Sequence, residues 1–182
     1  SFPEITGGVE CLIHEIADGT SSKGIKTDVL SLTYEDKSKV LDMKNYILHK
    51  EKCNFQIAST GFSLSVIFKF YKLSREVDII HYHFPYPFMD MVHFVTGNKT
   101  PFLVTYHSDI VRQKILNFFY YPLKIYFLKK AKFIVATSPN YLETSKVLKK
   151  FSKKSKIIPI GLNRKRYINP KKSDLNFWEK RI

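Results

Sequence analysis

The sequence has few of the features that define several protein classes. It contains only two cysteines, Cys11 and Cys53, which lie far apart and form no CxxC pair. This spacing fits neither a disulfide framework nor a cysteine-based zinc site, and we interpret both residues as free thiols in a reducing compartment. No apolar run reaches the ~18 residues that a membrane span requires, and no secretory signal is visible. We therefore expect a soluble or peripheral protein.

Acidic residues are scarce in the second half of the chain. Residues 1–111 hold 11 Lys and Arg against 13 Asp and Glu, whereas residues 112–182 hold 19 against 3. Residues 112–182 therefore carry a balance of +16 against −2 for residues 1–111, within a formal net charge of +14 for the chain, and this asymmetry indicates a polyanionic or membrane-surface partner for the second half. The 44% hydrophobic and 15% aromatic content argues against disorder, and 182 residues suffice for one α/β domain.

A strand–helix–strand unit forms the centre of the sequence. The runs Val77–Tyr82 and Phe102–Thr105 are rich in β-branched and aromatic residues, which is typical of strands buried on both faces of a parallel sheet. Between them, Pro87–Thr96 has apolar residues at helical spacing and a proline at its start. This pattern predicts a βαβ unit.

Strands and helices alternate along the rest of the chain, which predicts an α/β, Rossmann-like doubly wound parallel sheet. Further helices are expected at 9–18, 61–73, 110–130 (kinked or broken at Pro122) and 138–151. Further strands are expected at 27–32, 133–137 and 156–160, with two short strands or a hairpin at 45–48 and 54–58. A charged connection is expected at 34–42.

Polar residues follow the two central strands, where ligands of open α/β sheets bind. His81 and His83 close the first strand, and the second is followed by the run YHSD that ends at Asp109. Near the N-terminus, Gly7 and Gly8 precede a helix, and paired glycines there let an anion approach backbone N–H groups. The alternative is a helix that merely follows loop glycines.

Five motifs occur in the order and spacing of a known family. They are GGVE at 7–10, DIIHYHFP at 78–85, VTYHSD at 104–109, IVATSPNY at 134–141 and IPIGLN at 158–163. In these motifs the chain resembles retaining family 4 glycosyltransferases, and the resemblance extends over nearly the whole chain. More narrowly, the chain resembles bacterial enzymes that add mannose or rhamnose to O-antigen polysaccharide.

The resemblance implies one half of a GT-B enzyme, in which two Rossmann-like domains face each other across a cleft. We expect residues 1–168 to form the N-terminal acceptor-side domain, and residues 169–182 to begin a linker to a C-terminal nucleotide-sugar domain missing from this sequence. The strand that usually precedes the glycine loop is also absent. Ile160 and Asn163 depart from the family pattern, which has Asn before the glycine and Asp after the following residue.

The resemblance also implies roles for individual residues. His107 is the expected catalytic residue beside the donor sugar, Gly7 and Gly8 are expected to bind the nucleotide-sugar donor, and His83, Asp109 and Arg112 are expected to contact substrate. Asp109 can instead cap a helix at Ile110, which we favour, and Arg112 can lie on a solvated helix face. The His and Asp spacing also suits a metal, but the family implies no metal here and no cofactor beyond a GDP- or UDP-linked sugar.

The implied function is transfer of a hexose to a lipid-linked polysaccharide acceptor by a cytoplasmic enzyme, peripheral at the inner face of the plasma membrane. Basic and aromatic residues mix in segment 110–132, which suits an anionic membrane surface, although an aromatic stripe is also typical of a core. A non-catalytic basic module that binds membrane or nucleic acid is the main alternative. The chain shows no RNA-binding signature, so we expect no nucleic-acid partner. A dinucleotide-dependent oxidoreductase would require GxGxxG, which GGVE does not supply.

Overall fold

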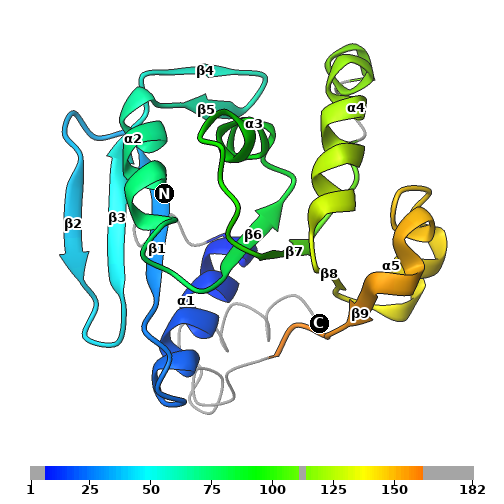
Figure 1. Cartoon of the computed structure of the whole chain (residues 1–182), viewed down its shortest axis with the longest axis horizontal. Helices are drawn as coiled ribbons and strands as arrows, with labels where there is room; N and C mark the ends of the chain where they lie inside the picture. The colour runs from blue at the N-terminus through cyan, green and yellow to red at the C-terminus, as the bar shows by residue number, and fades with distance from the viewer. Residues whose placement is uncertain (1–6, 111–113, 162–182) are drawn as a thin grey trace, which may run out of the picture.

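A computed structural model describes residues 7–110 and 114–161 (Figure 1). The helices are α1 (Gly8–Ser21), α2 (Leu64–Leu73), α3 (Pro87–Val95), α4 (Lys114–Lys130) and α5 (Pro139–Thr144), followed by a 3-10 helix, η1 (Leu148–Lys154). The strands are β1 (Asp28–Thr33), β2 (Lys39–Asp42), β3 (Ile47–Lys52), β4 (Phe55–Ile57), β5 (Thr60–Phe62), β6 (Ile80–Phe84), β7 (Phe102–Tyr106), β8 (Phe133–Ala136) and β9 (Ser155–Ile157).

The second half of the described chain confirms the expected parallel sheet. Strands β6, β7, β8 and β9 form a four-stranded sheet in that order, and every neighbouring pair is parallel. All four carboxyl ends therefore lie at one edge. Within the described residues, β6 ends this sheet and β1 ends the three-stranded sheet β1-β3-β2, and no strand joins the two.

The strands in the first half of the chain differ from those expected, because charged residues occur in them and hide the apolar pattern that predicts a strand. Strand β2 lies within the segment expected to be a charged connection, and it pairs antiparallel with β3 as an edge strand. Strand β3 extends to Lys52 because its buried charges have partners: Lys50 lies 3.6 Å from Glu35, and Ser38 donates a 2.8 Å hydrogen bond to Glu51. Of the two alternatives for 45–48 and 54–58, two separate strands are confirmed by β3 and β4, and the hairpin was wrong, since β4 pairs with β5 instead.

Three helices also differ from expectation. The helix expected at 61–73 begins only at Leu64, because Thr60–Phe62 form β5 and Ser63 caps the helix. The helix expected at 138–151 ends at Thr144 because Ser145 takes an extended backbone conformation, and η1 begins three residues later. Helix α4 continues through Pro122, which the sequence predicted would kink or break it. The proline removes the hydrogen bond to the carbonyl of Phe118, and because Phe118 is strongly exposed, solvent can take its place.

The two faces of the parallel sheet are covered differently. Alternate residues of β6, β7 and β8, including Phe84 and Tyr106, pack against α3 and α4 in the main core. Since successive strand residues point to opposite faces, the other face carries His81, Thr105 and Val135. Residues of α1 line a cavity with these three side chains, so α1 covers this second face.

Candidate functional site

The site expected at the carboxyl edge of the sheet is built by β6 and β7. Because the strands pair in parallel with His83 opposite Thr105, His107 lies just past the end of β7, two residues beyond the position opposite His83. Its backbone N–H donates to the carbonyl of Phe84 at 2.9 Å, which continues the strand pairing. His107 therefore leaves the sheet in a fixed position.

Three imidazoles and one hydroxyl interleave across the two strands. The His83 Nδ1 and His107 Nε2 atoms are 3.0 Å apart, and their rings lie within 14° of parallel. The His81 ring stacks on His83 with 4.5 Å between centroids, and its Nε2 lies 2.7 Å from the Thr105 hydroxyl oxygen. The structure thus brings the predicted His83 and His107 into direct contact.

Burial keeps these rings neutral. Burial, and next the proximity of His107, lowers the pKa of His81 to about 4. Burial and the two neighbouring histidines lower the pKa of His83 to about 3, and burial also lowers the pKa of His107. Near pH 7 each ring can therefore donate one hydrogen bond and accept another. Such a group can orient a sugar hydroxyl or a departing phosphate without a metal.

Asp109 makes structural contacts in this chain. Its Oδ1 accepts hydrogen bonds from the Tyr106 hydroxyl at 2.7 Å and from the Ser145 hydroxyl at 3.2 Å. These contacts tie the segment after β7 to the end of α5. The expected cap of a helix at Ile110 was wrong, because Ile110 is not helical and the described part of α4 begins at Lys114.

The glycine loop lies at the start of α1. Gly7 is the N-cap residue in an extended conformation, and Gly8 is the first residue of the helix. A Cβ on Gly7 would meet the Glu10 carboxylate, whereas a Cβ on Gly8 would meet nothing within 4 Å. The first turn is therefore open at Gly8 and faces an acidic side chain at Gly7. Binding of the donor by these glycines stays a prediction.

A cavity of about 580 Å³ separates α1 from the histidine face of the sheet. Leu12, Glu15 and Ile16 of α1 line it opposite His81 and Thr105, and the segment 158–161 closes another side. Sequence reasoning did not assign roles to Glu15 or Thr105. Thr105 could have been found, because it lies two residues before His107 and so shares its face of the strand.

Two other expectations concern Arg112 and metals. Arg112 lies outside the described residues, and its contact with substrate stays a prediction. Within residues 7–110 and 114–161, no group of three or more His, Cys, Asp or Glu is arranged to hold a metal ion. In the same part of the chain, no helix is long and apolar enough to cross a bilayer.

Comparison with solved structures defines the class of fold. Sucrose-phosphate synthase from Thermosynechococcus elongatus matches 94% of this chain with a TM-score of 0.65 at 18% identity, and the match covers 47% of that protein. An E. coli structure described as trehalose-6-phosphate bound with UDP-2-fluoro glucose matches the whole chain with a TM-score of 0.57 at 11% identity, over 52% of its own length. The chain thus has the fold of one half of a GT-B protein.

Sequence comparison then gives the family. The model of Glycosyltransferase Family 4 matches residues 6–166, and this chain belongs to that family. D-rhamnosyltransferase WbpZ of Pseudomonas aeruginosa is 42% identical over 179 residues, and O-antigen chain mannosyltransferase C of Escherichia coli is 40% identical over 161. The matches include 98% and 88% of this chain but 47% and 43% of those proteins. The chain therefore spans just under half the length of these relatives.

Proposed function

We propose that this chain is the acceptor-side domain of a retaining hexosyltransferase. The enzyme moves mannose, rhamnose or a similar sugar from a GDP- or UDP-linked donor to a lipid-linked polysaccharide acceptor. The observation that carries the proposal is the neutral His83–His107 pair at the carboxyl edge of the sheet, in a chain 42% identical to a named rhamnosyltransferase. Retention of configuration rests on the family resemblance alone.

The chemistry requires groups that this site supplies. The bond between the anomeric carbon and the donor phosphate oxygen breaks, and a bond forms from that carbon to an acceptor hydroxyl oxygen. The hydroxyl proton leaves with the nucleoside diphosphate. His107 would contact the reacting sugar, and the open first turn of α1 at Gly8 would face the donor phosphates, where backbone N–H groups and the helix dipole favour negative charge. Arg112 would contact the acceptor.

The other half of the reaction requires a second domain. We propose that residues 1–168 form the N-terminal domain and that residues 169–182 lead to a C-terminal domain that holds the nucleotide. The support is the length of the relatives, of which this chain covers 47% and 43%. The His107 edge would then face the second domain across a cleft, since ligands of such sheets lie beyond the carboxyl ends of the strands.

The enzyme would work at the inner face of the plasma membrane, where we propose that α4 contacts the lipid. The first turns of α4 extend beyond α3 (Figure 1). They expose four large apolar residues over one side of the helix: Ile115, Leu116, Phe118 and Phe119. Exposed lysines occur on α4 and on the following segments, at positions 129, 130, 132, 146, 149, 150, 153 and 156.

The second part of segment 110–132 also contributes to the core. Phe127 and Leu128 are fully buried, and Lys124, one of the basic residues of segment 110–132, is only 2% exposed and donates to Asn117 at 2.8 Å. The membrane proposal therefore rests on residues 115–119 and the exposed lysines. An apolar face beside basic residues suits an anionic membrane interface.

Transfer assays on the full-length gene product test the proposed function. The purified protein is incubated with one labelled nucleotide sugar at a time and with a lipid-linked saccharide acceptor, and label in the lipid fraction is counted. We expect transfer from a GDP- or UDP-linked hexose. Failure to transfer any such sugar, by protein that binds neither donor nor acceptor, would contradict the proposal. Salt-dependent retention on nucleic acid in the same preparation would favour the non-catalytic basic module.

A further inference from the structure

Two adjacent residues of β6 hold His107. The Phe84 carbonyl accepts its backbone N–H at 2.9 Å, and His83 Nδ1 contacts its ring Nε2 at 3.0 Å. The two ring planes lie within 14° of parallel, with 5.3 Å between centroids. Both the main chain and the imidazole of His107 are therefore attached to the same strand. The backbone bond places the residue, and the ring contact orients the side chain.

His83 is itself held from its other side. The His81 ring stacks against it at 4.5 Å, and His81 Nε2 is fixed by the Thr105 hydroxyl at 2.7 Å. The series runs from Thr105 of β7 through His81 and His83, which share one face of β6, to His107 just past the end of β7. The stack on His81 therefore holds the plane of the His83 ring, and the contact with His107 is what selects the flip of that ring that points Nδ1 at His107.

The contact between the ring nitrogens of His83 and His107 constrains which nitrogen carries a proton, as well as where the His107 ring lies. One of the two nitrogens must carry a hydrogen and the other must be bare, because two bare or two protonated nitrogens repel. If His107 Nε2 carries the hydrogen, its Nδ1 is an acceptor; if Nε2 is bare, Nδ1 is a donor. The partner of one ring nitrogen in this way determines what the other nitrogen offers to a ligand.

We propose that His83 is a positioning residue that holds His107 in one ring orientation and one neutral tautomer for sugar transfer. The proposal rests on the proposed function for its catalytic consequence, but the hydrogen bond and the tautomer are properties of the protein itself. His83 contacts no reacting atom in this account. It acts by fixing which nitrogen of His107 donates and which accepts.

Two substitutions separate the hydrogen bond from the ring stack. His83→Phe keeps an aromatic ring against His81 and His107 but supplies no polar atom. His83→Asn loses the ring, but its side-chain amide reaches the place of Nδ1 and can donate or accept. A merely structural ring should be replaced better by Phe, whereas a positioning hydrogen bond should be replaced better by Asn.

The experiment uses the full-length protein with ¹⁵N-labelled histidine, and His107→Gln assigns the His107 signals. In the wild type we expect one protonated and one bare ring nitrogen for His107, with a coupling across the Nδ1–Nε2 hydrogen bond to His83. In His83→Phe the ¹⁵N chemical shifts of the two His107 ring nitrogens should become averaged, because the ring exchanges between tautomers. The same variant should lower kcat by about 10- to 100-fold with little change in donor KM. His83→Asn should keep the distinct nitrogens and restore most of kcat.

Several results would overturn the proposal. The absence of the coupling in the wild type would do so without any variant, as would unchanged His107 nitrogens in a folded His83→Phe protein. A normal kcat in His83→Phe, or better activity from Phe than from Asn, would show that His83 acts only by packing. If the wild type transfers no sugar, the proposed function fails, and so does the catalytic role of His83, while the spectra still decide whether His83 fixes the tautomer.

Discussion

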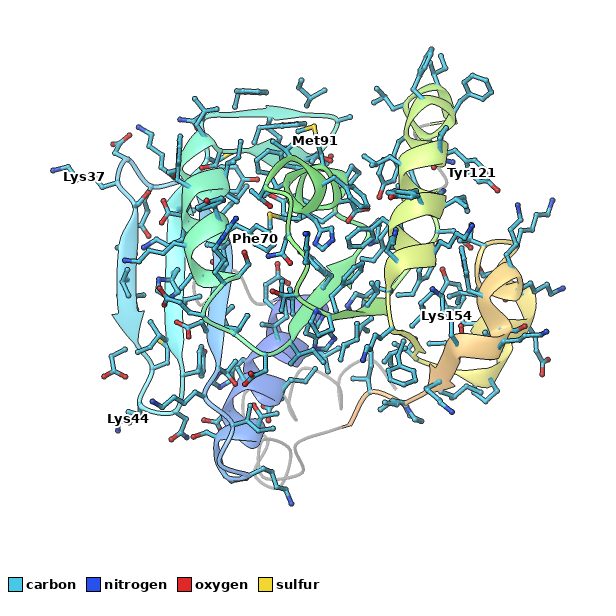
Figure 2. All side chains as sticks on the ribbon, viewed as in Figure 1. Lys37, Lys44, Phe70, Met91, Tyr121 and Lys154 are labelled. Atoms are coloured by element: carbon cyan, nitrogen blue, oxygen red, sulfur yellow. The ribbon has the colours of Figure 1, made fainter. Side chains whose placement is uncertain are left out.

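The Nζ atom of Lys154 lies within hydrogen-bond distance of the carbonyl of Leu128, at 2.5 Å. It also donates to the carbonyls of Lys129 and Ala131, at 2.7 and 2.9 Å. One lysine of η1 thus satisfies three carbonyls at the C-terminal end of α4, where cations are stabilised by the helix dipole. Figure 2 shows Lys154 between the base of α4 and the following helices. This contact joins the last part of the domain to the helix that covers the core.

Lys154→Met should therefore destabilise the protein. Methionine keeps much of the apolar stem but leaves the three carbonyls without their donor, at a cost of about 1–3 kcal/mol. Lys153→Met is the matched control, since the neighbouring Lys153 is exposed and loses the same charge. The measurement is the free energy of unfolding in denaturant for both variants. Equal, small losses would show that the Lys154 contacts contribute nothing beyond surface charge.

A buried carboxyl on α3 should make stability depend on pH. Asp90 is 2% exposed and accepts a hydrogen bond from Tyr120, and burial raises its pKa to about 7 although that bond lowers it. In the unfolded chain its pKa is 3.8, so the folded state binds the extra proton between pH 4 and pH 7. The contribution of Asp90 to stability is therefore fully present below about pH 4 and is lost as the pH rises towards about 7.

Asp90→Asn removes this titration and keeps an oxygen for Tyr120. The melting temperature of the variant relative to the wild type should rise from pH 5 to pH 7 and stay constant above pH 8. Melting curves of both proteins at these values, in buffers of equal ionic strength, provide the measurement. A difference that does not change with pH would mean that Asp90 is not held protonated in the fold.

The exposed turns of α4 should direct binding to anionic vesicles. Replacing Phe118 and Phe119 by Ser removes two large apolar side chains that are 74% and 75% exposed. Phe68→Ser on α2 is the control, because Phe68 is also 75% exposed but lies on another helix. Sedimentation with vesicles at low salt should fall for the double variant and not for the control. Equal sedimentation of the wild type with neutral and anionic vesicles would remove the membrane proposal.

Residues 1–182 alone should transfer no sugar. The nucleotide is expected to bind to a second domain, and this chain covers less than half the length of its two named relatives. The assay compares the purified chain with the full-length gene product at equal concentration and with the same donors and acceptor. Turnover by the shorter protein that rises with its concentration and persists after repurification would refute the assignment of nucleotide binding to a second domain.

The sequence predicted the parallel sheet but not the charged strands. Runs such as 102–105 and 133–137 are continuous and apolar, so they identify buried strands on their own. Strand β3 ends in His49, Lys50, Glu51 and Lys52, and its burial depends on partners such as Glu35, which lies 15 positions before Lys50. A local pattern contains no information on such pairs.

The sequence predicted which residues form the site, but it did not predict the contacts between them. The motifs placed His83 and His107 at the ends of two neighbouring strands, and the structure brings their ring nitrogens to 3.0 Å. That contact depends on the register of β6 against β7, which places His83 opposite Thr105. Asp109 was expected to act locally, but Ser145, 36 residues away, donates to it.

The central claim is that His107 stabilises the transition state of sugar transfer. It is tested most directly by measuring kcat for His107→Ala in the full-length protein, with nucleotide affinity and melting temperature recorded for the same preparation. We expect kcat to fall by about 10²–10³-fold while nucleotide affinity and melting temperature change little. A well-folded His107→Ala enzyme with near-normal kcat would contradict the account and remove His107 from the mechanism.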